Sequence, residues 1–139
     1  MFGMRTPLSG LVALAMLLPL ATAAAQSKSS RWKEIGKTSV GNTVYVDPGS
    51  VKTVNGIITA RLRVKFLKQE APEYWWQSHH LAMFDCAKKL VAAQESIYYT
   101  DEAATKVVRR TDIKIPGYGP AIGGSMTKVA LDYFCPEKP

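Results

Sequence analysis

The residues best suited to chemistry are two adjacent histidines, His79 and His80, in the stretch "YWWQSHHLAMFDC". Imidazole binds metal ions and titrates near neutral pH, so such a pair could hold zinc or transfer protons. The aromatic content of the stretch favours a β-strand, and adjacent residues of a strand point to opposite faces. The two rings therefore cannot hold one ion without a kink, and we expect neither a metal site nor a cofactor.

A hydrolase site is the alternative chemistry in the same stretch. Ser78 precedes His79, and Asp85 follows further along the chain. Serine, histidine and aspartate act as nucleophile, base and orienting acid when a fold brings them together. However, no glycine-flanked nucleophile turn surrounds Ser78. We expect a non-enzymatic protein, with an enzyme near His79, His80 and Asp85 as the second alternative.

A set of basic residues could instead bind a partner. Arg61, Arg63 and Lys65 alternate with apolar residues at 60, 62, 64 and 66, and the chain has a formal net charge of +7 at pH 7. A strand of this pattern has one buried face and one wet face. The wet face either deters edge pairing and aids solubility, or it docks anionic glycans, lipopolysaccharide phosphates or acidic protein patches. It could be extended by Lys88, Lys89, Arg109 and Arg110 if their strands are neighbours.

The second candidate for partner binding is the aromatic run Tyr74, Trp75 and Trp76, in an expected loop that leads into a strand. Such rings either complete a core or form a recognition hot spot. Strand alternation allows one tryptophan to point inward and the other outward.

The N-terminal segment and the cysteines indicate export. Residues 1–25 combine Arg5, an apolar run at 11–18 and small residues at 23–25, as a secretory signal peptide does. Pro19 interrupts the apolar run, which argues against a membrane span. We expect a flexible lead-in over residues 26–31 and one domain over 32–139. Its two cysteines, Cys86 and Cys135, are expected to form a disulfide.

The pattern between these features predicts an α+β domain. Turn signals at Gly41-Asn42 and Asn55-Gly56 separate apolar runs as in hairpins. Another hairpin is expected to join the strands on either side of residues 87–89, with a helix over 81–94 as the less favoured reading. Ser125 can cap a helix over residues 126–134, whose apolar stripe is Met126, Val129, Ala130 and Phe134. The fold class is therefore α+β: an antiparallel sheet of about six strands, a C-terminal helix and one disulfide.

Asp47 is the one carboxylate in "TVYVDPGSV". Pro48 presets φ and Gly49 can supply a positive φ, which predicts a type II turn with Asp47 as a local hydrogen-bond acceptor. We therefore interpret Asp47 as a structural residue rather than a catalytic one.

The order of these short motifs resembles the surface-adhesin protein E-like domain of exported bacterial proteins, over about residues 31–136. The residues that carry the resemblance are Trp32, Ile35, Gly36, Val44, Tyr45, Val46, Asp47, Ser50, Asp85, Cys86, Ser125 and Cys135. The resemblance implies a sheet with a C-terminal helix and a disulfide. It also implies an adhesin, whose best-known type binds host matrix and plasma proteins and is anchored through a lipidated cysteine that this sequence lacks.

We therefore expect a small exported binding domain whose partner is a protein or an anionic glycan or envelope component. Its first alternative is a periplasmic accessory or inhibitor protein of the cell envelope. Export makes nucleic acid an unsuitable partner, and we expect no membrane span after signal removal. The expected location is periplasmic or secreted.

Overall fold

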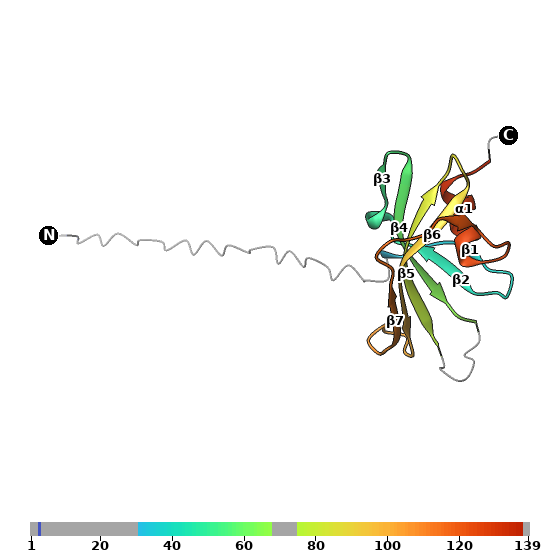
Figure 1. Ribbon diagram of the computed structural model, residues 1–139. Helices are drawn as coiled ribbons and strands as arrows, with labels where there is room; N and C mark the ends of the chain where they lie inside the picture. Colours follow the sequence, from blue (N-terminus) through green and yellow to red (C-terminus); the bar gives the residue numbers. More distant parts are fainter. Residues whose placement is uncertain (1–2, 4–30, 68–74, 138–139) are drawn as a thin grey trace.

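The computed structural model describes residue 3, residues 31–67 and residues 75–137. The predicted signal peptide and lead-in, apart from Gly3 and Arg31, lie outside these residues, and so does Tyr74. Figure 1 shows a strongly curled sheet with the C-terminal helix against it.

The sheet is antiparallel throughout. Its six main strands are β1 (Lys33–Lys37), β2 (Thr43–Val46), β4 (Ile57–Lys65), β5 (Gln77–Asp85), β6 (Leu90–Tyr99) and β7 (Val107–Asp112), paired in that order. Two short strands extend it: β3 (Lys52–Val54) pairs with β4, and β8 (Gly119–Pro120) pairs with β6. The expected fold class is confirmed, and the alternative helix over 81–94 is wrong because β5 and β6 form a hairpin there.

Two turns test the local predictions. Asn55 and Gly56 have φ angles of 51° and 78°, as a type I′ turn between β3 and β4 requires. The type II turn predicted after Asp47 is wrong: Pro48–Ser50 form a short 3₁₀ helix, and Gly49 does not adopt a positive φ. The Asp47 carboxylate caps this helix by accepting from the Gly49 N–H at 3.1 Å, so its expected structural role takes another geometry.

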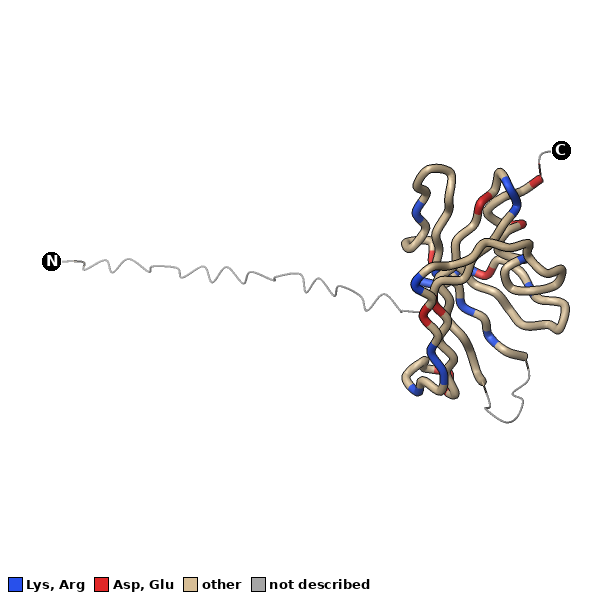
Figure 2. The backbone as a smooth tube through the Cα atoms, in the orientation of Figure 1, with Lys and Arg blue, Asp and Glu red and all other residues tan. Residues whose placement is uncertain are grey.

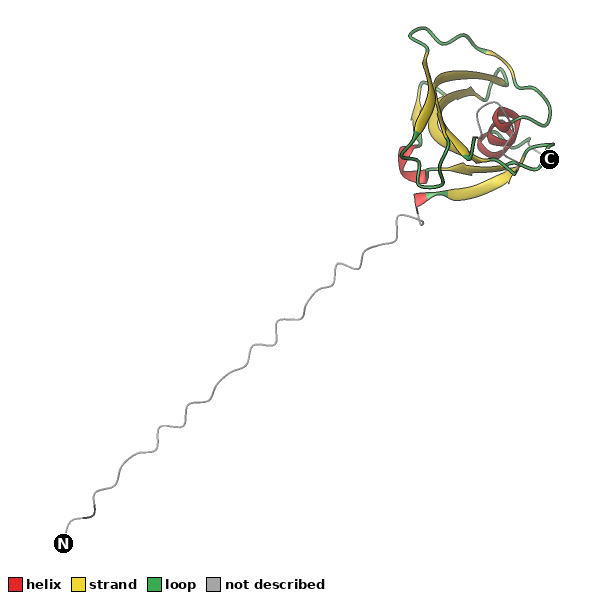
Figure 3. Ribbon diagram, turned by 90° about the horizontal axis from the view of Figure 1, so that it is seen from below, coloured by secondary structure: helices red, strands yellow, loops and turns green. Residues whose placement is uncertain are grey.

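The core lies between the curled sheet and helix α1 (Met126–Phe134), which sits in the concave side of the sheet (Figure 3). Ser125 caps the helix as predicted, because its hydroxyl accepts from the Lys128 N–H at 3.2 Å. The predicted stripe omitted Leu131, which is buried beside Ala130. The core cluster contains Val46, Ala60, Leu62, Ala82, Phe84, Val91, Ala130 and Leu131. The disulfide Cys86–Cys135 joins the end of the helix to the end of β5, as expected.

Helix α1 packs tightly against Gly36 on β1. A Cβ at this position would lie 2.8 Å from Val129 Cγ1. We therefore expect Gly36→Ala to lower the free energy of unfolding by about 1–3 kcal/mol, a typical cost of overpacking. Urea denaturation would measure it, with Gly117→Ala as the control because nothing lies within 4 Å of that position. Adding Val129→Ala should recover part of the loss; equal stability of Gly36→Ala and wild type would contradict the prediction.

Candidate functional site

The two faces of the sheet differ in chemistry. On β4, Ala60, Leu62 and Val64 are buried, and the first two belong to the core under α1. We call this the inner face. Arg61, Arg63 and Lys65 alternate with them and lie on the opposite, outer face, as the sequence pattern predicted.

Strand register continues the outer face across the sheet. Tyr45 on β2 lies opposite Arg63, and Arg63 lies opposite His79 on β5. His79 is followed across the sheet by Ile97 on β6 and then Arg110 on β7. Of the four residues expected to extend the basic face, Arg110 does so. Lys88 and Lys89 lie in the β5–β6 turn, and Arg109 lies opposite Tyr98 on the inner face.

Rings surround the middle of the outer face. Trp32 lies 5.1 Å from His79, and His79 lies 4.9 Å from Tyr99, between ring centroids. The Arg63 guanidinium lies over the Tyr45 ring, 5.4 Å from its centroid. We call Trp32, Tyr45, Arg63, His79 and Tyr99 the aromatic–arginine cluster; all five are partly exposed. Within it, Arg63 Nε is buried and has no hydrogen-bond partner among the described residues.

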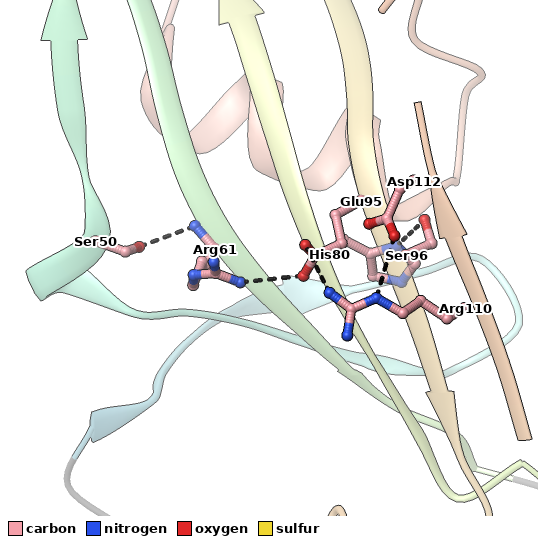
Figure 4. A network of polar contacts seen from close by, with 7 residues as sticks. All are labelled: Ser50, Arg61, His80, Glu95, Ser96, Arg110 and Asp112. Carbon is pink, nitrogen blue, oxygen red and sulfur yellow. Dashed lines mark hydrogen bonds and ion pairs between the residues drawn. The ribbon is translucent and has the colours of Figure 1, made fainter. Parts of the chain in front are cut away.

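Most arginines of the outer face are neutralised by carboxylates. Figure 4 shows Glu95 between Arg61 and Arg110, at 3.4 Å from each. Arg110 also contacts Asp112 at 3.2 Å. Figure 2 shows how these basic and acidic positions are distributed over neighbouring strands.

The remaining cations of this face differ in their surroundings. Arg31 pairs with Asp47 at 2.8 Å and also lies over the Trp32 ring. Arg63 and Lys65, in contrast, have no carboxylate partner within the described part of the chain. Arg63 and Lys65 are therefore two cations of β4 whose positive charge no carboxylate in the described residues offsets.

The charge of this face acts on His79. Its pKa is lowered from 6.5 to about 4, first by burial and then by the positive charges of Arg63, Arg31 and Arg61. The ring is therefore neutral at pH 7, and its Nε2 lies 3.0 Å from the Gln77 side-chain oxygen, to which it can donate. His79 thus adds an uncharged donor and an aromatic surface rather than another positive charge.

Replacing Arg63 should change the pKa of His79. We expect Arg63→Gln to raise the pKa of His79 from about 4 towards 6.5, because the largest charge effect on the ring disappears. Lys65→Gln removes the same charge from the same face but should leave the His79 pKa nearly unchanged, since Lys65 does not contribute to the shift. NMR titration of the imidazole carbon-bound protons would measure both. Equal shifts in the two variants would contradict this assignment.

His80 lies on the inner face, so the two histidines point to opposite sides as predicted. Its Nε2 is 2.7 Å from Ser78 Oγ, its Nδ1 is 2.9 Å from Ser96 Oγ, and Tyr98 packs edge-on against the ring. Burial, with a smaller effect of His79, lowers the pKa of His80 to about 4. The neutral ring therefore forms hydrogen bonds with the buried Ser78 hydroxyl and the partly buried Ser96 hydroxyl.

The structure does not bring together the serine, histidine and aspartate side chains of the alternative hydrolase site. The Ser78–His80 pair is buried, with 1% and 7% of the two residues exposed, and the second imidazole nitrogen meets a serine rather than a carboxylate. Asp85 lies at the far end of β5 and accepts from the Lys88 N–H at 3.2 Å. The described residues also contain no group of histidine, cysteine and acidic side chains that could hold a metal ion.

Within the predicted aromatic run, Trp75 lies apart from the basic face. Trp75 packs on Tyr98, 4.4 Å between ring centroids, and near Phe66, while Arg109 lies over its ring. These contacts place Trp75 with the inner-face residue Tyr98. Trp76 is partly buried, and its backbone pairs with Phe66 and Tyr99. The rings beside Arg63 are instead Tyr45 and His79, and Trp32 and Tyr99 flank His79. The sequence analysis noted Trp32, Tyr45 and His79 but assigned none of them to the basic surface.

With this geometry in view, the chain can be compared with known proteins. Residues 32–136 match the family model of surface-adhesin protein E. The chain belongs to this family. No functionally curated protein matches it. Within the described residues, no helix is long and apolar enough to cross a membrane.

Solved structures of Haemophilus influenzae protein E share the fold of this family member. Crystal form II is 14% identical with a TM-score of 0.51, over 76% of this chain and 87% of that one. The selenomethionine form is 15% identical with a TM-score of 0.50, over 76% and 86%. At these identities the likeness concerns the fold alone.

Several residues on which the sequence resemblance rested make specific contacts in the fold. Ser50 Oγ accepts from the Arg61 N–H at 2.8 Å and donates to the Asp47 carbonyl at 2.7 Å, which joins the 3₁₀ helix to β4. Asp85 caps the β5–β6 turn and Ser125 caps α1. Trp32 and Tyr45, in contrast, lie in the aromatic–arginine cluster.

Proposed function

We propose that this chain is an exported, non-enzymatic binding domain that engages acidic partners through its outer face. The observation that carries the proposal is the pair of uncompensated cations, Arg63 and Lys65, beside partly exposed rings on one face of β4. Membership of an adhesin family supports a binding role. Host matrix or plasma proteins and anionic envelope components are the partner classes that fit this chemistry.

The distribution of charge favours an acidic partner over an apolar one. Rings and arginines are enriched where proteins recognise partners, and clustered positive charge attracts acidic surfaces over nanometre distances. The fixed pairs of Glu95 with Arg61 and Arg110 hold the neighbouring side chains in place. A partner carboxylate or sulfate would then meet Arg63 and Lys65 rather than compete for guanidinium groups that are already paired.

The proposal is tested by binding of the purified protein to an immobilised heparin-like polymer at increasing salt. We expect binding that weakens as salt rises, because charge attraction is screened. The double variant Arg63→Gln/Lys65→Gln should elute at clearly lower salt than wild type. The matched control, Lys88→Gln/Lys114→Gln, removes two charges that lie in the β5–β6 turn and beyond the end of β7, and it should elute closer to wild type. Equal loss in both variants would indicate attraction by net charge alone and would contradict the proposed surface.

Export is the second part of the proposal. The disulfide supports it, because such bonds form and persist in oxidising compartments. Cell fractionation combined with protease treatment of intact cells would test it. Recovery in the cytoplasmic fraction would contradict export, whereas removal by the protease would favour surface display over the alternative role of a periplasmic accessory protein.

A further inference from the structure

Arg63 differs from every other arginine of the outer face. Arg31, Arg61 and Arg110 each contact a carboxylate, whereas Arg63 has no such partner in the described residues. Its Nε is buried without a hydrogen bond, so the protein bears a desolvation cost to hold this guanidinium in place. A cation that served only solubility would extend into water, as the exposed Lys65 can.

Rings on both neighbouring strands flank Arg63. Tyr45 lies beneath the guanidinium on one neighbouring strand, and His79 lies opposite it on the other. His79 is itself packed between Trp32 and Tyr99. A planar guanidinium held by a ring can present its remaining N–H groups as a fork that matches two oxygens of a carboxylate or sulfate.

We propose that Arg63 is the anion-binding centre of the outer face and that its ligand is the carboxylate or sulfate group of an acidic saccharide. This inference rests on the proposed function and narrows its partner class. A sugar ring has apolar C–H surfaces beside its polar groups, so its body can contact Trp32 or Tyr99 while its anionic group meets Arg63. A carboxylate on a flexible peptide side chain can pair with the positive charge of Arg63, but it brings no rigid ring into contact with Trp32 or Tyr99.

The pKa of His79 can report whether an anion is bound at Arg63. His79 is neutral at pH 7 because burial and the positive charge around it oppose protonation. An oxyanion bound at Arg63 would offset that charge, so bound ligand should raise the pKa of His79. A ligand attracted to a distant part of the basic surface would leave the imidazole unchanged.

The experiment titrates the purified protein with a sulfated uronic-acid tetrasaccharide, monitoring both affinity and the His79 resonances by NMR. The controls are the desulfated, carboxyl-reduced tetrasaccharide and an acidic peptide of equal charge. We expect the charged saccharide to bind, its neutral form to bind at least 10-fold more weakly, and the His79 pKa to rise only with the former. Arg63→Gln should weaken binding at least 10-fold, whereas Lys65→Gln should change it less than 3-fold.

The outcomes separate this inference from the broader proposal. Equal weakening by Arg63→Gln and Lys65→Gln, or binding without a change at His79, would overturn the Arg63 site. Binding of the acidic peptide but not the saccharide would overturn the saccharide assignment and leave the proposed function standing. Failure of both ligands and of the heparin-like polymer would overturn both. Arg63→Lys retains the charge but not the fork, and a folded Arg63→Lys protein with wild-type affinity would also contradict the inference.

Discussion

Replacing Cys86 and Cys135 together with alanine should lower the free energy of unfolding by about 4 kcal/mol. The bond joins residues 49 apart in sequence, and closing a loop of that size removes much of the conformational entropy of the unfolded chain. Such a loss is a large share of the stability of a small domain. In a domain of this size it corresponds to a fall in melting temperature on the order of 20 °C.

The position of the disulfide indicates which part of the fold would lose stability first. Cys135 follows the last residue of α1, and the helix contributes Ala130 and Leu131 to the core, so the bond holds the helix end against the sheet. We expect hydrogen exchange in α1 to accelerate more than in β4 and β5. A reducing agent should reproduce the effect in wild type and leave the double variant unchanged. A double variant as stable as oxidised wild type would contradict this prediction.

Acid should destabilise the protein through His80. The folded state holds this ring neutral with a pKa of about 4, whereas an exposed histidine has a pKa of 6.5. Between these values the unfolded state binds the proton more readily than the folded state, so stability falls as pH falls from 6.5 to 4. The integrated loss for His80 is about 3 kcal/mol at pH 4, and it levels off below that pH.

Urea denaturation of wild type and His80→Gln over this pH range would measure the effect. The variant should be less stable at pH 7, because Ser78 and Ser96 lose their shared partner, but its stability should depend less on pH. His79→Gln is the matched control. Its ring is partly exposed, so solvent screening should make its contribution smaller. An unchanged pH dependence in His80→Gln would show that the ring is not held neutral by burial.

Several features could be predicted because their causes are local. The Asn55-Gly56 turn follows from the φ angles that these residues tolerate, and the Ser125 cap follows from one hydroxyl near free N–H groups. Alternation on β4 placed Arg61, Arg63 and Lys65 on one face, and two cysteines in a chain expected to be exported indicated the disulfide. The type II turn predicted after Asp47 was wrong because Pro48 and Gly49 are compatible with more than one tight backbone geometry. The 3₁₀ helix that they adopt is accompanied by contacts of Asp47 with Arg31 and with β4.

Short-range sterics and period-two geometry suffice to predict the strand pattern, the capped helix, the cysteine pair and the alternating basic residues from the amino-acid sequence. Which of the basic residues keep an uncompensated charge depends instead on contacts between strands. Glu95 is 34 residues from Arg61, and their contact depends on the register of three strands. The same register places Arg63 between Tyr45 and His79. Whether a cation meets a carboxylate or a ring is therefore set by cross-strand pairing, which one strand's sequence does not specify.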